Sequence, residues 1–250
     1  MRRNLVVQQV PNLVTLANLA CGSLGIVYAL THTYENFWNA AYFILLAGIF
    51  DFLDGFVARL LKVSSELGKQ LDSLSDVVSF GVLPGVLVQV LLFHILPENL
   101  EFLKYIFLLI PLMSSYRLAR FNLETHGGTH FIGLPTPANA FFWAGVVLMY
   151  GGMTRAVEVF IPYPLVILGV IFLSYLLVSD IEMFSLKFKK WHWRANRMQY
   201  LFLLMTGLLV FAFERTMHWA VSLPVTIGVY ISFSIALHWT KKNHFFELKK

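Results

Sequence analysis

The stretch that decides the fold reads Asp51-Phe-Leu-Asp54-Gly55-Phe-Val-Ala58-Arg59 and, after eight further residues, Gly68-Lys-Gln-Leu-Asp72-Ser-Leu-Ser-Asp76. It holds four of the five aspartates in a chain of 250 residues that is 58% hydrophobic. A carboxylate at the centre of a membrane helix costs about 2.5–3.5 kcal/mol on insertion scales. Four carboxylates in one apolar region therefore need compensation, and a bound cation supplies it.

The composition places this stretch in a membrane. Only 13% of the residues are charged, whereas a soluble domain carries roughly 25%. Long apolar runs separated by short polar breaks predict an all-α integral membrane protein with about eight transmembrane helices, at roughly 20 residues per span. The expected spans are 13–31, 38–61, 70–94, 102–121, 136–153, 160–179, 198–214 and 219–240.

The distribution of basic residues predicts how these spans are oriented. With eight spans, sixteen of the 19 lysines and arginines fall on one side of the membrane and three on the other. Basic loops stay on the cytoplasmic side. We therefore expect a multi-pass membrane protein with both termini and the active site facing the cytoplasm. The net charge of +5 is then a topology signal, and nucleic-acid binding is not expected.

Helical spacing predicts that the four carboxylates meet. The span that contains Asp51 and Asp54 runs toward the cytoplasm, and the next span runs back, so both pairs lie in the cytoplasmic half of the bilayer. Asp51 and Asp54 are i,i+3 neighbours, and Gly68, Asp72 and Asp76 follow one another at i,i+4. Each set therefore shares one face of its helix, and the active site is expected between the two faces.

The chemistry of these side chains favours a metal centre. Carboxylate oxygens without histidine or cysteine suit a hard cation, Mg²⁺ or Mn²⁺. Four carboxylates can hold two ions about 3.5–4 Å apart, an arrangement that clamps a phosphate group. Gly55 and Ala58 leave room for a flat ligand or a neighbouring backbone, and Arg59 can bind phosphate oxygens. The residues alone thus indicate phosphoryl or phosphatidyl transfer at the cytoplasmic membrane surface, without naming the substrate.

Structural packing and ion transport are the alternatives to an enzyme. Small residues can simply pack helices together, but four buried negative charges beside one arginine are not balanced. A cation transporter also places aspartates along its ion pathway, and such proteins usually show interrupted helices at matching positions of two halves. No second copy of the 51–76 pattern occurs in the chain, and the carboxylates are expected near one membrane face instead of the midplane.

The spacing Asp-x2-Asp-Gly-x2-Ala-Arg-x8-Gly-x3-Asp-x3-Asp closely resembles the signature of the CDP-alcohol phosphotransferase family of integral membrane enzymes, with every fixed position present. Enzymes of that family transfer a substituted phosphate from a CDP-linked donor to an alcohol and release CMP. The resemblance also implies a homodimer. It assigns metal binding to Asp51, Asp54, Asp72 and Asp76, general-base catalysis to Asp76, the cytidine pocket to Gly55, Ala58 and Gly68, and the donor phosphates to Arg59.

Further segments resemble one branch of the family, the membrane-bound phosphatidylserine synthases. They are Pro11-Asn12-Leu-Val-Thr15-Leu-Ala-Asn18, Arg117-Leu-Ala-Arg120-Phe-Asn122, Phe131-Ile-Gly133-Leu-Pro135-Thr136-Pro137-Ala138 and Ser179-Asp-Ile-Glu-Met-Phe184-Ser185-Leu-Lys187. This branch implies transfer of a phosphatidyl group from CDP-diacylglycerol to L-serine. Glycerol 3-phosphate and inositol or an inositol phosphate are the alternative acceptors.

The resemblance divides the chain in two. Residues 1–187 hold the catalytic helices, about six spans, and residues 188–250 hold a basic loop and two further spans without a recognisable motif. Both parts are expected to form one membrane domain.

The branch segments add candidate binding residues. Asn12 and Thr15 can reach the nucleotide or merely anchor the first helix, and Ser65 can contact a phosphate or merely shape its loop. A second group consists of basic residues that can hold a serine carboxylate or a donor phosphate, or serve as positive-inside anchors: Arg117, Arg120 and Lys187.

Overall fold

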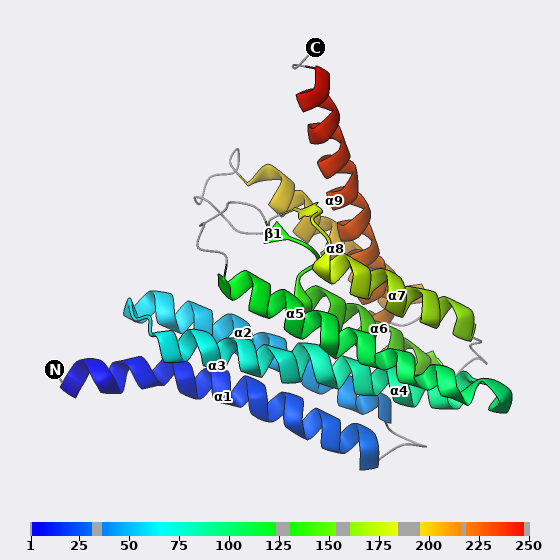
Figure 1. Cartoon of the computed structure of the whole chain (residues 1–250), viewed down its shortest axis with the longest axis horizontal. Coiled ribbons are helices and arrows are strands. Elements are labelled where there is room, and N and C mark those ends of the chain that lie inside the picture. Colours follow the sequence, from blue (N-terminus) through cyan, green and yellow to red (C-terminus); the bar gives the residue numbers. More distant parts are fainter. Residues whose placement is uncertain are drawn as a thin grey trace.

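The computed structural model describes residues 2–31, 37–123, 131–153, 161–184, 196–216 and 219–247. Almost all of these residues are helical (Figure 1). Two short strands, β1 (Phe131–Ile132) and β2 (Glu182–Met183), pair antiparallel. The all-α class predicted from the sequence is therefore confirmed.

Several straight helical segments combine different helix types. In chain order the elements are α1 (Arg2–Thr31), η1 (Phe37–Ala40), α2 (Ala41–Leu61), α3 (Glu66–Asp76), η2 (Val77–Val82), α4 (Leu83–Ile95), η3 (Glu98–Leu108), α5 (Leu109–Leu123), α6 (Thr136–Met153), α7 (Tyr163–Val178), α8 (Arg197–Thr216), η5 (Trp219–Val221) and α9 (Ser222–Glu247). Helix η2 is a π-helix, and η1, η3 and η5 are 3-10 helices.

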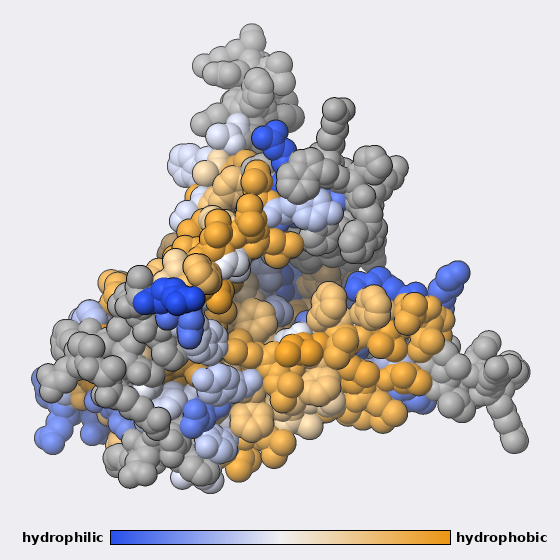
Figure 2. All heavy atoms as spheres, turned by 180° about the vertical axis from the view of Figure 1, so that it is seen from behind, coloured by the Kyte–Doolittle hydropathy of each residue, from blue (hydrophilic) through white to orange (hydrophobic). Residues whose placement is uncertain are grey.

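The protein is an integral membrane protein. Within the described residues, five helical segments are long and apolar enough to cross a bilayer: Gln9–Thr31, Phe37–Leu61, Glu66–Ile95, Glu98–Leu123 and Trp219–Thr240. Figure 2 shows apolar side chains spread over the middle of the helices, with polar groups gathered toward their ends. Helices α6, α7 and α8 occupy the other three predicted ranges, and their crossing of the membrane stays a prediction.

Helix α1 joins the two helices that carry the four aspartates of residues 51–76. Helix α1 packs on both α2 and α3, and α5 packs on η2 and α7. Figure 1 shows these helices running roughly parallel or antiparallel, with the N-terminus at one end of the bundle. Helix α9 packs on α6 and rises steeply away from the bundle toward the C-terminus. The aspartates thus lie in the part of the bundle formed by α1, α2 and α3.

The turn between α2 and α3 is tighter than the sequence indicated. Lys62 ends α2 with a φ of 54°, in the left-handed region that is typical of a helix C-terminus. Ser65 then caps α3 by accepting a hydrogen bond of 3.0 Å from the backbone N–H of Gly68. Helix α3 therefore begins at Glu66 and not near Gln70 as expected, because the sequence-based span followed hydropathy and overlooked the cap.

Candidate active site

Three carboxylates from two helices form the centre of the site. Asp51 on α2 and Asp72 and Asp76 on α3 each offer an oxygen, and these three oxygens lie within 4.8 Å of one another. In the described part of the chain, neither these three residues nor Asp54 forms an ion pair. An all-oxygen donor set with uncompensated negative charge fits a hard divalent cation. The residues present are therefore suited to holding Mg²⁺ or Mn²⁺.

Side chains of helix α1 hold two of the four carboxylates by hydrogen bonds. The Thr15 hydroxyl donates a hydrogen bond of 2.7 Å to Oδ2 of Asp54. One turn further along α1, Nδ2 of Asn18 donates to Oδ1 of Asp76 at 3.4 Å. Ser75 in turn donates to the backbone carbonyl of Thr15 at 3.1 Å. Since all five side chains are at least nine-tenths buried, these bonds hold α1, α2 and α3 in one register around the carboxylates.

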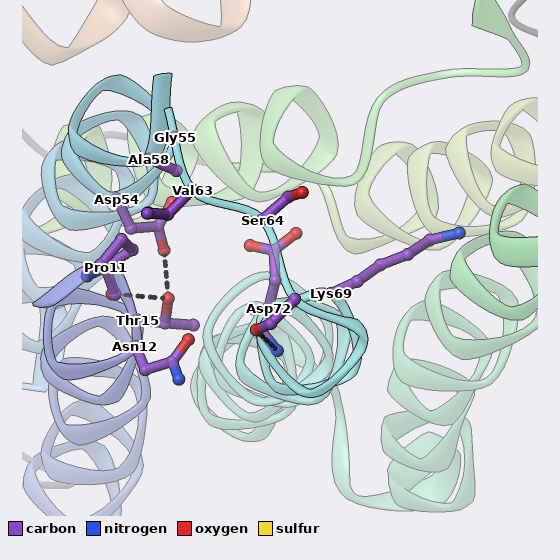
Figure 3. A pocket seen from close by; sticks show the side chains of 12 residues that line it. Pro11, Asn12, Thr15, Asp54, Gly55, Ala58, Val63, Ser64, Lys69 and Asp72 are labelled. Atoms are coloured by element: carbon purple, nitrogen blue, oxygen red, sulfur yellow. Dashed lines mark hydrogen bonds between the residues drawn. The ribbon is translucent and has the colours of Figure 1, made fainter. Parts of the chain in front are cut away.

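A cavity of about 290 Å³ opens beside the carboxylates. Figure 3 shows α1, α2 and α3 presenting side chains to a common space, with the Asp54–Thr15 hydrogen bond at one side. The cavity is lined by Pro11, Asn12, Thr15, Asp54, Gly55, Ala58, Val63, Ser64, Ser65, Gly68, Lys69 and Asp72.

Small residues keep this cavity open. A methyl group at Gly55 would have only one neighbour within 4 Å outside its own helix backbone, Nη1 of Arg59 at 3.9 Å. At Gly68 the same group would lie 2.9 Å from Oδ1 of Asn12 and 3.0 Å from Oγ of Ser65. Gly55 therefore leaves free volume, whereas Gly68 permits a close approach of α1 to the start of α3.

The structure places most of the predicted donor-site residues on this cavity. Six of the seven line it: Asn12, Thr15, Gly55, Ala58, Ser65 and Gly68. The seventh, Arg59, is exposed and has its guanidinium near Gly55. Of the four aspartates, Asp54 and Asp72 line the cavity, while Asp51 and Asp76 lie in the adjoining carboxylate cluster.

The predicted acceptor arginines lie around a second, much smaller cavity. It measures about 20 Å³ and is lined by Arg117, Arg120, Phe121, Ile132, Leu177, Val178 and Ser179. Arg117 is buried and donates to the Thr136 hydroxyl at 3.1 Å. Arg120 pairs with Asp180 at 2.7 Å. Lys187, the third candidate, lies outside the described residues.

Contacts between α5 and the helical segment that contains Asp76 show at which level along the bundle Arg117 lies. The Asn122 side chain donates to the hydroxyl of Ser73 at 2.8 Å. Eight residues earlier on α5, Ser114 packs against Gly81, where an added methyl group would meet it at 3.2 Å. The two helical segments run in opposite directions, so Arg117 lies at about the level of Asp76.

Sequence reasoning missed three functional candidates. Asn18 lies within a quoted segment, but only the structure shows its hydrogen bond to Asp76. Asp180 is the fifth aspartate of the chain and also lies within a quoted segment, but only the structure shows its pairing with Arg120. Lys69 lines the cavity and points away from the carboxylates (Figure 3), where it donates to the carbonyl of Asn122.

Comparison with known proteins adds an independent finding. The sequence model of a family described as CDP-alcohol phosphatidyltransferase matches residues 8–176. This range contains the four aspartates and the two arginines, whereas Asp180, β2, α8 and α9 lie beyond it.

Individual relatives carry one enzyme name. A CDP-diacylglycerol–serine O-phosphatidyltransferase of Helicobacter pylori (strain ATCC 700392 / 26695) is 31% identical over 234 residues, which is 92% of this chain and 90% of the relative. The protein of that name from Bacillus subtilis (strain 168) is 34% identical over 178 residues, or 69% of this chain and 88% of the relative. One from Methanocaldococcus jannaschii is 40% identical over 132 residues, 53% of this chain and 57% of the relative.

Proposed function

The chain belongs to the CDP-alcohol phosphatidyltransferase family, and we propose that it transfers the phosphatidyl group of CDP-diacylglycerol to the hydroxyl of L-serine, giving phosphatidylserine and CMP. The observation that carries this proposal is the cluster of Asp51, Asp72 and Asp76 beside a cavity of about 290 Å³. The names of the relatives from three organisms support serine as the acceptor.

Four aspartates would hold the metal. The cluster supplies Asp51, Asp72 and Asp76, and Asp54 adds a fourth carboxylate one turn from Asp51. Two divalent ions, Mg²⁺ or Mn²⁺, would neutralise the donor pyrophosphate when bound. Thr15 restrains one oxygen of Asp54 and leaves the other oxygen of that carboxylate for a ligand.

The donor would enter the cavity through its CDP end. Gly55, Ala58 and Gly68 present little side-chain bulk there, which suits the flat cytosine ring. Asn12 offers an amide to the nucleotide, and Arg59 offers a guanidinium to the phosphates at the edge of the cavity. The acyl chains would remain among lipids, since the surrounding helices expose large apolar side chains on their outer faces.

Asp76 would act as the general base. Its carboxylate takes the proton of the serine hydroxyl as the serine oxygen forms a bond to the phosphorus that carries diacylglycerol. The bond from this phosphorus to the bridging pyrophosphate oxygen breaks, and CMP leaves with that oxygen. Asn18 holds Oδ1 of Asp76, so that Oδ2 is the oxygen left to receive the proton.

The charged residues around the small cavity on α5 suit the acceptor. Free serine carries a carboxylate and an ammonium group, which need partners of opposite charge. Arg117 and Arg120 supply the positive charge, with Lys187 as a further candidate, and Asp180 supplies a negative charge 2.7 Å from Arg120. Glycerol 3-phosphate and inositol carry no ammonium group, so this pairing of charges favours serine over the two alternative acceptors.

The orientation in the membrane and the oligomeric state belong to the same proposal. The sixteen-to-three split of basic residues supports a cytoplasmic active site and cytoplasmic termini. Family resemblance supports a homodimer.

Replacing single carboxylates tests the metal site. Asp51→Asn and Asp72→Asn should each abolish serine-dependent CMP release from CDP-diacylglycerol at saturating Mg²⁺ or Mn²⁺, because each removes charge from the shared site. Glu101→Gln is the matched control, since Glu101 is an exposed carboxylate paired with Lys104 and should be dispensable. Retention of most wild-type activity in either aspartate variant would contradict the metal assignment.

A further inference from the structure

Helix α9 bonds to the backbone of β2 through one stripe of side chains. His238 accepts a hydrogen bond of 3.2 Å from the N–H of Glu182 through Nδ1. Ser234 accepts one of 3.1 Å from the N–H of Phe184. The hydroxyl of Tyr230 donates to the carbonyl of Phe184 at 2.9 Å. These contacts join parts of the chain that lie 46 to 56 residues apart.

The match between helix and strand is geometric. Tyr230, Ser234 and His238 follow one another at four-residue steps on one face of α9, about 6 Å apart along the axis. Glu182 and Phe184 are two residues apart on an extended segment, which is about 6.6 Å. Backbone groups two residues apart point to the same edge of a strand, so α9 covers one edge of β2.

The other edge of the same segment faces β1. Ile132 pairs with Glu182, and Gly133 donates from its N–H to the carbonyl of Ile181 at 2.9 Å. The segment 180–184 is thus held between β1 and α9. Its first residue is Asp180, which pairs with Arg120 at the rim of the small cavity.

We propose that Tyr230, Ser234 and His238 form a positioning face of the acceptor site: α9 fixes segment 180–184 so that Asp180 stays against Arg120 and the two present opposite charges to serine. This inference rests on the proposed function, because it takes the arginine-lined cavity as the serine site. It gives α9, which lies beyond the residues matched by the family model, a role in substrate recognition.

Steady-state kinetics of the purified full chain test this role. His238→Ala removes the acceptor for the N–H of Glu182, and the KM for serine should rise about fivefold, as expected for the loss of one net hydrogen bond. The KM for CDP-diacylglycerol should stay at the wild-type value, and the thermal midpoint should fall by no more than a few degrees. His238→Asn retains an acceptor at a similar position and should restore the serine KM. Ser234→Ala should reproduce the effect of His238→Ala.

Two comparisons separate positioning from general destabilisation. Ser232→Ala is the matched control on α9, because Ser232 is exposed and its hydroxyl bonds to Gly228 of its own helix; its serine KM should not change. In an Arg120→Ala background, His238→Ala should cause no further rise in the serine KM, since α9 acts through Asp180 and Arg120.

Three results would overturn the inference. Unchanged serine KM in both His238→Ala and Ser234→Ala, in a protein that makes phosphatidylserine, would refute it and leave the proposed function intact. A parallel loss of kcat, of affinity for both substrates and of thermal midpoint would show a merely structural role. A wild-type protein that yields no lipid from serine would overturn the proposed function and the inference with it.

Discussion

Asp76 occupies a position that allows both metal binding and proton transfer. It ends α3, is 8% exposed and belongs to the carboxylate cluster. Asn18, itself fully buried, donates to Oδ1 of Asp76 and has no hydrogen-bond partner for its own Oδ1 within the described structure. A buried acceptor without a donor carries a free-energy cost, which a proton-bearing ligand in the site would relieve.

Replacing Asp76 separates its two roles. Asp76→Asn should nearly eliminate phosphatidyl transfer while binding of CDP-diacylglycerol stays largely intact, because three carboxylates remain to hold an ion. Turnover is followed by CMP release, and binding by isothermal titration with the CDP-lipid in detergent. If binding and turnover fell together, Asp76 would be chiefly a ligand, and the general-base role would lose its support.

Gly55 offers a test of the donor cavity. Gly55→Ala should fold normally, since an added methyl group would meet only Nη1 of Arg59, at a van der Waals distance of 3.9 Å, and helix propensity should favour it by roughly 0.5–1 kcal/mol. Because that space is part of the cavity, the KM for CDP-diacylglycerol should rise severalfold. Gly207→Ala on α8, where the added group has no neighbour within 4 Å, is the control. Equal donor KM values in the two variants would argue against a nucleotide in this cavity.

Residues of the donor site were predictable because their spacing is local. The signature from Asp51 to Asp76 spans one helix, one turn and the next helix, so helical geometry alone indicated that its members meet. Asn18 and Asp180 were missed because each acts through a contact with a distant segment, 58 and 60 residues away. No periodicity in the sequence reports such a contact.

At the scale of elements, the close packing of α1 on η2 supports the carboxylate site. A methyl group at Gly22 of α1 would lie 2.8 Å from the Cα atom of Ser79. At the same contact the Ser79 hydroxyl donates to the carbonyl of Asn18 at 3.0 Å. The π-helical turn thus presents a small hydroxyl side chain at the point where α1 has no side chain, one turn beyond Asp76.

Enlarging Gly22 should therefore disturb this packing. Gly22→Ala forces η2 away from α1, and we expect a loss of about 1–3 kcal/mol in stability together with reduced transfer. Thermal unfolding in detergent and CMP release measure the two effects. Gly228→Ala on α9, with no neighbour within 4 Å of the added group, should show neither. A thermal midpoint for Gly22→Ala at or above that of the wild type would refute the packing argument.

The π-helix itself was not predicted, for a physical reason. Residues 66–95 form one continuous helical segment, which begins with the polar residues 66–76 and continues into an apolar stretch, so its pattern indicates a span without showing a change of helix type. A π-turn adds a residue to the helical repeat and depends on packing partners, here Asn18 on α1 and Ser114 on α5. Both partners come from other helices.

At the scale of the whole molecule, the fold class followed from the composition, whereas the place of α9 did not. The sequence predicted an all-α membrane protein, and the structure confirms that class with five described segments able to span a bilayer. The last two predicted spans carried no motif. The structure gives α9 a defined place, because its side chains bond to β2 across 46 to 56 residues, a pairing that composition and periodicity do not encode.

The most direct test of the central claim is to identify the lipid product. The purified protein is incubated with CDP-diacylglycerol, Mg²⁺ or Mn²⁺, and serine, glycerol 3-phosphate or inositol in separate reactions, and the lipids are analysed by mass spectrometry. We predict phosphatidylserine from the serine reaction, CMP in equal amount, and no product from Asp51→Asn. A phosphatidyl lipid from glycerol 3-phosphate or inositol, with none from serine, would contradict the assigned acceptor, and no lipid product from any of the three would contradict phosphatidyl transfer to these acceptors.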